Sequence, residues 1–260
     1  MRKLMISTRI EGKKLFHSKI PLLTFLVLML IPFIGGFFMY VLKDPTAAES
    51  LGFISAKAQL MGNADWISYF SLIGQAITVG GLIAFGFITS WIFGREYSDR
   101  TIIDLLSLPI SRTTIVLSKF LITFFWSFLL SVFVFIVSLV VGYFVNIPGM
   151  TMGLLLEGTK IYFIASSLTI LLSTPVGLAA SYGRGYLSPL GFIVITLIFA
   201  QIIAATGYGE YFPWSIPTLI SVSIEDTNLI IQKLSLFLVL LTSGIGLIGT
   251  VFWWNYADND

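Results

Sequence analysis

The chain has 260 residues, of which 57% are hydrophobic, 15% are aromatic and only 11% are charged. A soluble domain carries roughly 25% charged residues and about 45–50% apolar ones, so this composition excludes a water-soluble enzyme, a disordered segment and a fibrous protein. The net charge of +2 does not indicate a nucleic-acid partner, and the lack of cysteine excludes disulfides and thiolate metal sites. The composition predicts an all-α, polytopic membrane protein.

The chain opens with a predicted elbow helix over 1–19, a basic amphipathic segment that leads into the first membrane span. Its cations are interspersed at loosely helical spacing with apolar residues such as Leu4, Ile10 and Phe16. Such a helix lies in the membrane interface with its cations toward anionic lipid headgroups. The single histidine of the chain, His17, stands in this segment. One imidazole cannot build a metal site, so no metal is expected.

Six stretches that carry no charge in their central part are predicted to cross the membrane as helices. An ionised side chain at the bilayer centre costs at least about 2.5–3.5 kcal/mol, and a helix needs about 20 apolar residues to cross. The predicted spans are 20–42, 67–94, 119–145, 161–182, 187–206 and 231–254. Asn146, Pro148 and Gly149 end the third span. The spans predict one transmembrane domain over 1–260.

The distribution of lysine and arginine predicts that both termini are cytoplasmic. Cytoplasmic loops collect these residues, and eleven of the fifteen lie before the first span, between spans two and three, or between spans four and five. The remaining four are Lys43, Lys57, Lys160 and Lys233, on the opposite side. A multi-pass protein of the cell membrane is therefore expected.

The loop between spans two and three, 95–118, holds the richest mixture of charges in the chain. Glu96 and Arg100 stand four residues apart, which favours an ion pair on a helix that continues past the membrane. Asp99 or Thr101 is expected to cap a new short helix, with Asp104 as a box-like partner three residues after Thr101.

The short helix of this loop is expected to present an apolar face outside the bilayer. Pro109 ends the helix, because the residue before proline is disfavoured in the helical region, and Ser111 is expected to cap the helix that follows. The face comprises Ile102, Leu105, Leu106 and Leu108. Two positions for it remain open at this stage, one on the membrane surface and one in a groove on a cytoplasmic partner.

Aromatic residues gather in the segment after the fifth span. They are Tyr208, Tyr211, Phe212 and Trp214, with Pro213 and Pro217 among or beyond them. Trp and Tyr favour the headgroup level, so one interpretation is an aromatic belt at the outer interface. The other is a short re-entrant or interfacial helix that caps a translocation path from outside.

The sequence carries no nucleotide-binding or catalytic motif. Residues 244–249 match G-x-G-x-x-G, but they lie inside the last span, where small residues favour close helix packing. No Walker-type loop occurs, so the chain is expected to be neither an enzyme nor a cofactor binder. The strongest polar groups inside the spans are Gln75 and Gln201, which are either interhelical hydrogen-bond partners or ligands along a translocation path. Energy for any uphill transport would come from elsewhere.

The loop 95–118 resembles the signature of ABC-2-type transporter permeases, the membrane subunits of bacterial ATP-driven exporters. Residues at matching positions are Glu96, Thr101, Leu105, Leu106, Pro109, Ser111, Arg112 and Lys119, while Arg100 replaces the usual glycine. The resemblance implies a coupling helix that contacts a separate ATPase subunit, which would hold the ATP and Mg²⁺. The contact residues it implies are Glu96, Arg100, Thr101, Asp104, Leu105, Leu106, Pro109 and Arg112. It also implies two permease protomers, identical or different, with two ATPases.

The stretch Tyr211-Phe212-Pro213-Trp214 resembles the six-span branch of that family, which includes bacitracin- and lantibiotic-type exporters. The resemblance, with the aromatic and uncharged interior, favours export of a hydrophobic or amphipathic substrate such as an antimicrobial peptide, a drug or a lipid. The alternative is a membrane scaffold or sensor that recruits a cytoplasmic partner through 95–118 without transport. An ion channel is disfavoured, because no charged ring or filter-like sequence occurs.

Overall fold

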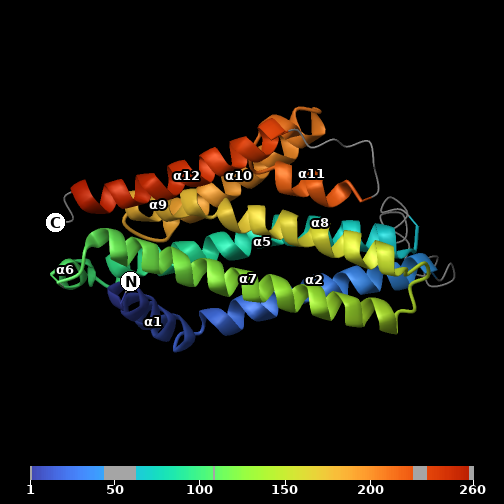
Figure 1. Cartoon of the computed structure of the whole chain (residues 1–260), viewed down its shortest axis with the longest axis horizontal. Helices are drawn as coiled ribbons and strands as arrows, with labels where there is room; N and C mark the ends of the chain where they lie inside the picture. Colours follow the sequence, from blue (N-terminus) through green and yellow to red (C-terminus); the bar gives the residue numbers. More distant parts are fainter. Residues whose placement is uncertain (1, 44–62, 108, 225–232, 258–260) are drawn as a thin grey trace.

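The computed structural model describes residues 2–43, 63–107, 109–224 and 233–257, with Leu106 described by its backbone alone. Every element in these residues is helical, and the long helices lie side by side in one elongated bundle (Figure 1). The elements are α1 (Arg2–Phe16), α2 (Ile20–Lys43), α5 (Trp66–Ser98), α6 (Ile102–Leu106), α7 (Arg112–Phe144), α8 (Met152–Leu171), α9 (Thr174–Tyr182), α10 (Leu187–Ala205), η1 (Gly209–Tyr211), α11 (Ile216–Val222) and α12 (Lys233–Tyr256). Lys57 and Leu108, both used in the sequence analysis, lie outside the described residues.

Within the described residues, six helical segments are long and apolar enough to cross a membrane, which confirms the all-α, six-span prediction. They are α2, α5, α7, the pair α8 and α9, α10 and α12. Two of them, α5 and α7, have 33 residues each, or about 50 Å at 1.5 Å per residue. They therefore project well beyond the roughly 30 Å of hydrocarbon in a bilayer, and the predicted spans 67–94 and 119–145 cover only part of them.

The fourth span starts earlier than the predicted 161 and is broken once. Thr151 caps α8, because its hydroxyl accepts a hydrogen bond from the Leu154 backbone N–H at 3.2 Å. Helix α8 ends at Leu171, and the chain restarts at Thr174 as α9, in which Pro175 occupies the first turn. A proline there costs no helical hydrogen bond. The proline fixes the position of the break.

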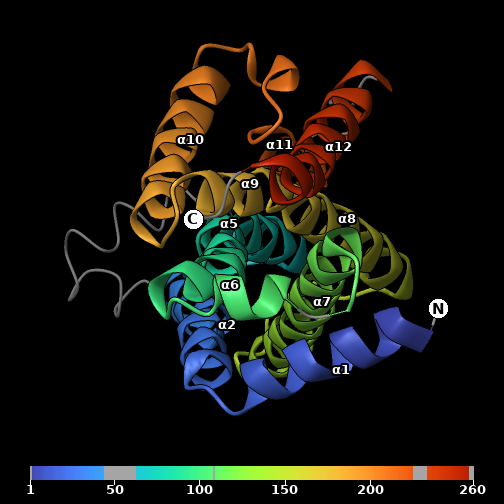
Figure 2. The same cartoon turned by 90° about the vertical axis from the view of Figure 1, so that its left-hand side faces the viewer.

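Helix α5 forms the centre of the bundle. Viewed from one end, it is surrounded by neighbouring helices, and it contacts α2, α7, α8, α9, α10 and α11 (Figure 2). Buried aromatic hydroxyl groups tie it and α8 to α7, since Tyr69 Oη donates to Ser138 O and Tyr162 Oη to Ser131 O, each at 2.9 Å. Trp66 Nε1 donates to Ile147 O, in the turn after α7, at 2.8 Å. Such bonds satisfy polar groups that lipid could not.

The glycine run 244–249 serves helix packing, as predicted. A Cβ at Gly246 would clash with the backbone nitrogen of Pro175, and one at Gly249 would lie 3.0 Å from the Leu178 side chain. Gly244 faces open space. The two packed glycines let α12 approach α9 closely.

The segment after α10 turns back along the bundle. Thr78 and Thr218 hydroxyls lie 2.9 Å apart, while Gly74 packs on Ser221. These paired positions run in opposite directions, so α11 is antiparallel to α5. Trp214 is half-buried and packs inside the bundle. Its ring packs edge-on against Phe192, at 5.7 Å between centroids.

The depth of Trp214 follows from its neighbour. Phe192 is only five residues from the first residue of α10, about 7.5 Å along the axis from the opposite end of that helix. Trp214 also packs on the cluster of Leu82, Val176 and Ile193 inside the bundle. Tyr208 and Tyr211 remain exposed, as a belt requires. The geometry supports the second interpretation, a short helix that re-enters the bundle.

Candidate functional site

The loop that resembles the ABC-2 signature lies at the end of the bundle where both chain termini lie (Figures 1 and 2). Helix α5 ends there in a Schellman turn: Arg100 N–H donates to Tyr97 O at 3.2 Å and Thr101 N–H to Glu96 O at 2.9 Å. Arg100 has a φ of 56°, the left-handed conformation that glycine adopts without strain. The usual glycine of the signature thus corresponds to this turn, and Arg100 makes the same turn.

A buried network of charges fastens this turn to the helices beside it. Glu96 Oε1 lies 2.8 Å from Lys119 Nζ of α7 and 3.0 Å from Lys14 Nζ of α1. Glu11 of α1 completes the network, with Oε2 at 3.1 Å from Lys119 and Oε1 at 3.0 Å from Lys14. Lys119 also donates to Ile92 O at 3.0 Å. Two carboxylates therefore face two ammonium groups, and Arg95 lies at the edge of the network with its Nε 4.0 Å from Glu96 Oε1.

Burial makes this network sensitive to the loss of any member. The side chains of Lys119 and Glu96 are 0% and 2% exposed, and an unpaired charge in such surroundings is strongly destabilising. Burial would raise the pKa of Glu11, but Lys119 and Lys14 outweigh it and hold that pKa below its usual value. Burial would lower the pKa of Lys14, but the carboxylates of Glu11 and Glu96 outweigh it and hold that pKa above its usual value. Both groups are charged at neutral pH.

The network corrects two predictions about the loop. Glu96 pairs with the lysines of α1 and α7 instead of Arg100, whose backbone reverses direction. Thr101 does not cap α6 with its side chain; its hydroxyl donates to Glu96 Oε2 at 2.6 Å, so the proposed box with Asp104 does not form. Ser111 does cap α7, as predicted, by accepting from Thr114 N–H at 3.3 Å.

The described part of the apolar face of α6 packs on its own bundle. Ile102 is buried, and Leu105 packs against the main hydrophobic core of the same chain. The opposite face points outward, with Ile103 at 64% exposure and Asp104 exposed beside it. Sequence periodicity indicated the apolar side formed by Ile102 and Leu105 but could not show what covers it.

The other predicted contact residues have mixed surroundings. Arg100, Thr101 and Pro109 are exposed, and Pro109 O accepts from Lys3 Nζ at 3.4 Å. Arg112 Nη1 donates to Trp254 O at 3.0 Å and so binds the last turn of α12, a favourable position for a cation. The side chain of Leu106 lies outside the described part.

The two glutamines do not meet. Gln75 Nε2 donates to Ser71 Oγ, one turn away on the same helix, at 3.1 Å, whereas Gln201 lies on the exposed face of α10. A groove of about 470 Å³ instead separates α2, α5 and α10. Its lining is apolar except for Thr24 and comprises Leu23, Val27, Ile83, Ala84, Phe87, Leu190, Ile193, Val194 and Leu197.

Sequence reasoning did not find Glu11, Lys14 and the pairing role of Lys119. One signal was available: Glu11 is the only acidic residue before the first span, within a segment of six cations. An isolated carboxylate in a basic helix indicates a specific partner. Within the described residues, no group of three or more His, Asp or Glu side chains could hold a metal ion.

Comparison with known proteins gives two similarities. Residues 8–202, three quarters of the chain, match the sequence profile of a family described as ABC-2 family transporter protein. The chain is also similar to the bacitracin transport permease protein BCRB of Bacillus licheniformis, with 28% identity over 135 residues. This match covers 52% of the chain and 65% of that protein's length.

Proposed function

Because the chain belongs to the ABC-2 family of transporter proteins, we propose that it is the permease subunit of an ATP-driven exporter whose ATPase is a separate chain. The observation that carries the proposal is the two-sided environment of α6. Its inner face is packed on the bundle beside the charge network, and its outer face, with Ile103 and Asp104, is uncovered. Such an arrangement suits a helix that receives force from a partner.

The proposed coupling runs from α6 into the spans through short connections. A displacement of α6 would act on α5 through the Schellman turn at Arg100, and on α1 and α7 through Glu96. Glu96 is buried, so its proposed role changes from direct contact with the ATPase to anchoring of the loop that makes the contact. The exposed contact candidates are Arg100, Thr101, Ile103, Asp104 and Pro109.

The proposed path for the cargo lies beside α10. In the most apolar 18-residue stretch of each helix, only 22% of the residues of α10 are buried, against 67% of those of α5. The outward face of α10 is apolar. Helix α10 would therefore face a second permease copy, identical or different, in a complex with two ATPases. The apolar groove between α2, α5 and α10 would then adjoin that interface. Its chemistry suits a hydrophobic or amphipathic cargo, moved outward from the cytoplasm or inner leaflet.

The proposed orientation places α6 and both termini in the cytoplasm. It rests on the eleven cations that lie on the α6 side of the bundle. ATP and Mg²⁺ would bind only to the partner ATPase.

The test compares two variants of the affinity-tagged protein, purified in mild detergent from membranes of its own host. Ile103→Asp places a charge on the outer face of α6, and the matched control Met152→Asp places one on an exposed apolar residue at the other end of the bundle. We expect the parent and Met152→Asp to retain a nucleotide-binding subunit with ATP hydrolysis, and Ile103→Asp to lose both.

Two outcomes would overturn the proposal. Retention of the ATPase by Ile103→Asp would show that α6 does not contact the ATPase. Capture by the parent of a cytoplasmic protein that binds no nucleotide, lost in Ile103→Asp, would instead favour the scaffold or sensor.

A further inference from the structure

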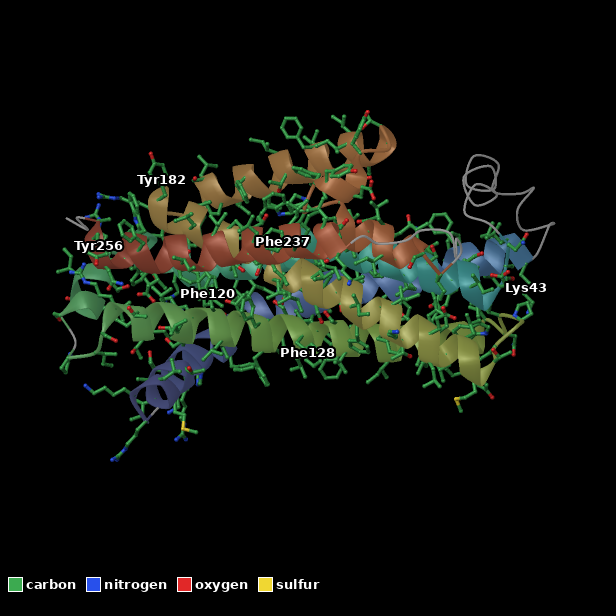
Figure 3. All side chains as sticks on the ribbon, turned by 45° about the horizontal axis from the view of Figure 1, so that its top comes forward. Lys43, Phe120, Phe128, Tyr182, Phe237 and Tyr256 are labelled. Atoms are coloured by element: carbon green, nitrogen blue, oxygen red, sulfur yellow. The ribbon has the colours of Figure 1, made fainter. Side chains whose placement is uncertain are left out.

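A large groove runs between the outer side of α1 and the first membrane-embedded turns of α7. Its volume is about 900 Å³. The lining residues are Leu4, Met5, Thr8, Arg9, Gly12, Lys13, Phe16, His17, Leu121, Ile122 and Phe125. The two helices diverge, because α1 points away from the bundle while α7 continues along it (Figure 3). Gly12 marks the line of contact, because a Cβ added there would lie 3.3 Å from the side chain of Ile122.

The groove has a basic rim and an apolar floor. Arg9 and Lys13 of α1 and His17, the residue after the helix, follow one another at four-residue spacing, so they line one edge of the groove. All three are exposed. No carboxylate lines the groove. The one acid of α1, Glu11, faces the opposite way into the buried network. The cations of the rim therefore have no acidic partner within the groove.

The floor lies at the depth of the acyl chains. Leu121 and Phe125 follow Lys119 by two and six residues as α7 enters its span, and Phe125 is 58% exposed. The exposed apolar face of α7 continues past them through Phe128, labelled in Figure 3. A ligand that used the whole groove would need an anionic group joined to a hydrocarbon chain.

We propose that this groove binds an anionic glycerophospholipid from the leaflet on the α1 side. Its phosphate would lie between Arg9 and Lys13, and an acyl chain would follow Leu121 and Phe125. A neutral lipid would leave the basic rim without a counter-charge, and an acidic peptide would leave the apolar floor uncovered. In the proposed orientation the leaflet is the cytoplasmic one, but binding itself does not depend on transport.

The test uses the full-length protein in phosphatidylcholine vesicles that contain a phosphatidylglycerol probe with a photoreactive acyl chain. After illumination, mass spectrometry measures labelling of the peptide that contains Leu121 and Phe125. The variant Arg9→Gln/Lys13→Gln removes two charges from the rim. The control Arg2→Gln/Lys19→Gln removes two exposed charges from the same segment outside the groove. A third variant, Leu121→Trp, fills the floor.

Each cation near an anionic lipid contributes about 1 kcal/mol, so the loss of two cations should weaken lipid binding about 30-fold. We therefore expect the rim variant to reduce labelling about 30-fold. The control should stay within about twofold of the parent, and Leu121→Trp should abolish labelling of the groove peptide alone. Equal labelling by a phosphatidylcholine probe would overturn the proposal, because it would make the groove an ordinary lipid-facing surface. Equal losses in the rim and control variants would overturn it as well. Since no readout involves ATP or cargo, failure here leaves the proposed function untouched.

Discussion

The buried charge network at the α6 end makes a strong prediction for Lys119→Met. Methionine keeps the length and apolar body of lysine but removes its ammonium group, which lies 2.8 Å from Glu96, 3.1 Å from Glu11 and 3.0 Å from Ile92 O. Two buried carboxylates would then face Lys14 and, at 4.0 Å from Glu96 Oε1, the Nε of Arg95. Removal of one partner from a buried ion pair costs about 3–5 kcal/mol of stability.

Thermal unfolding in detergent measures this loss. For a chain of this size, about 3–5 kcal/mol corresponds to a fall of about 10 °C in the unfolding midpoint. The control Lys13→Met removes an exposed lysine of α1 that belongs to no ion pair of the network and should shift the midpoint by no more than about 1–2 °C.

A second substitution tests the electrostatic cause. Glu96→Gln in the Lys119→Met background leaves Glu11 and Lys14 as a balanced pair, 3.0 Å apart. The double variant should therefore lose less stability than the sum of the two single variants, by about 1–3 kcal/mol. A Lys119→Met protein as stable as the parent, or strictly additive effects in the double variant, would refute the reasoning.

Two further predictions concern packing and pH. Gly246→Val drives a side chain into the backbone of Pro175 and should lower the free energy of unfolding by about 1–3 kcal/mol. Gly244→Val on the same helix faces open space and should be neutral, so equal midpoints for both would contradict the packing. The second prediction concerns pH. Because the pKa of Glu11 is lower in the folded protein than its usual 4.5, ionised Glu11 stabilises the fold above pH 4.5. This contribution is lost as the pH falls through the lowered pKa. The raised pKa of Lys14 stabilises the fold below 10.5 and is lost as pH rises through the raised value. The unfolding midpoint should therefore be level from about pH 5 to 10 and fall in stronger acid; a steady slope across neutral pH would argue against a fully charged network.

Properties that depend on nearby residues were readable from the sequence. The spans follow from long stretches without charge, and the cap at Ser111 from residues three positions apart. The position of α6 between the ends of α5 and α7 also follows from local composition. In each case the physical cause lies within one or two helical turns, where a single sequence holds all the information.

What the sequence did not reveal depends on distant parts of the chain. Lys119 and Glu11 are 108 residues apart in the sequence. The hydrophobic periodicity of either helix therefore does not indicate that the two helices pack together. The burial of Ile102 has the same origin, because an apolar face looks alike whether it packs on its own bundle, on a membrane or on a partner. Trp214 reads as an interfacial residue until the reversal after α10 is known. That reversal depends on Gly207, with a φ of 82°, and on Gly209, packed against Ala204.

The charge network also constrains the order in which the protein assembles during synthesis. Glu11, Lys14 and Glu96 precede Lys119 in the chain, so both acids are already made when the lysine leaves the ribosome. Lys119 lies seven residues into α7 and enters the membrane with the rest of that helix. A bundle in which α1 and α5 are already adjacent would offer the lysine two counter-ions on arrival, so its ammonium group need never be buried alone.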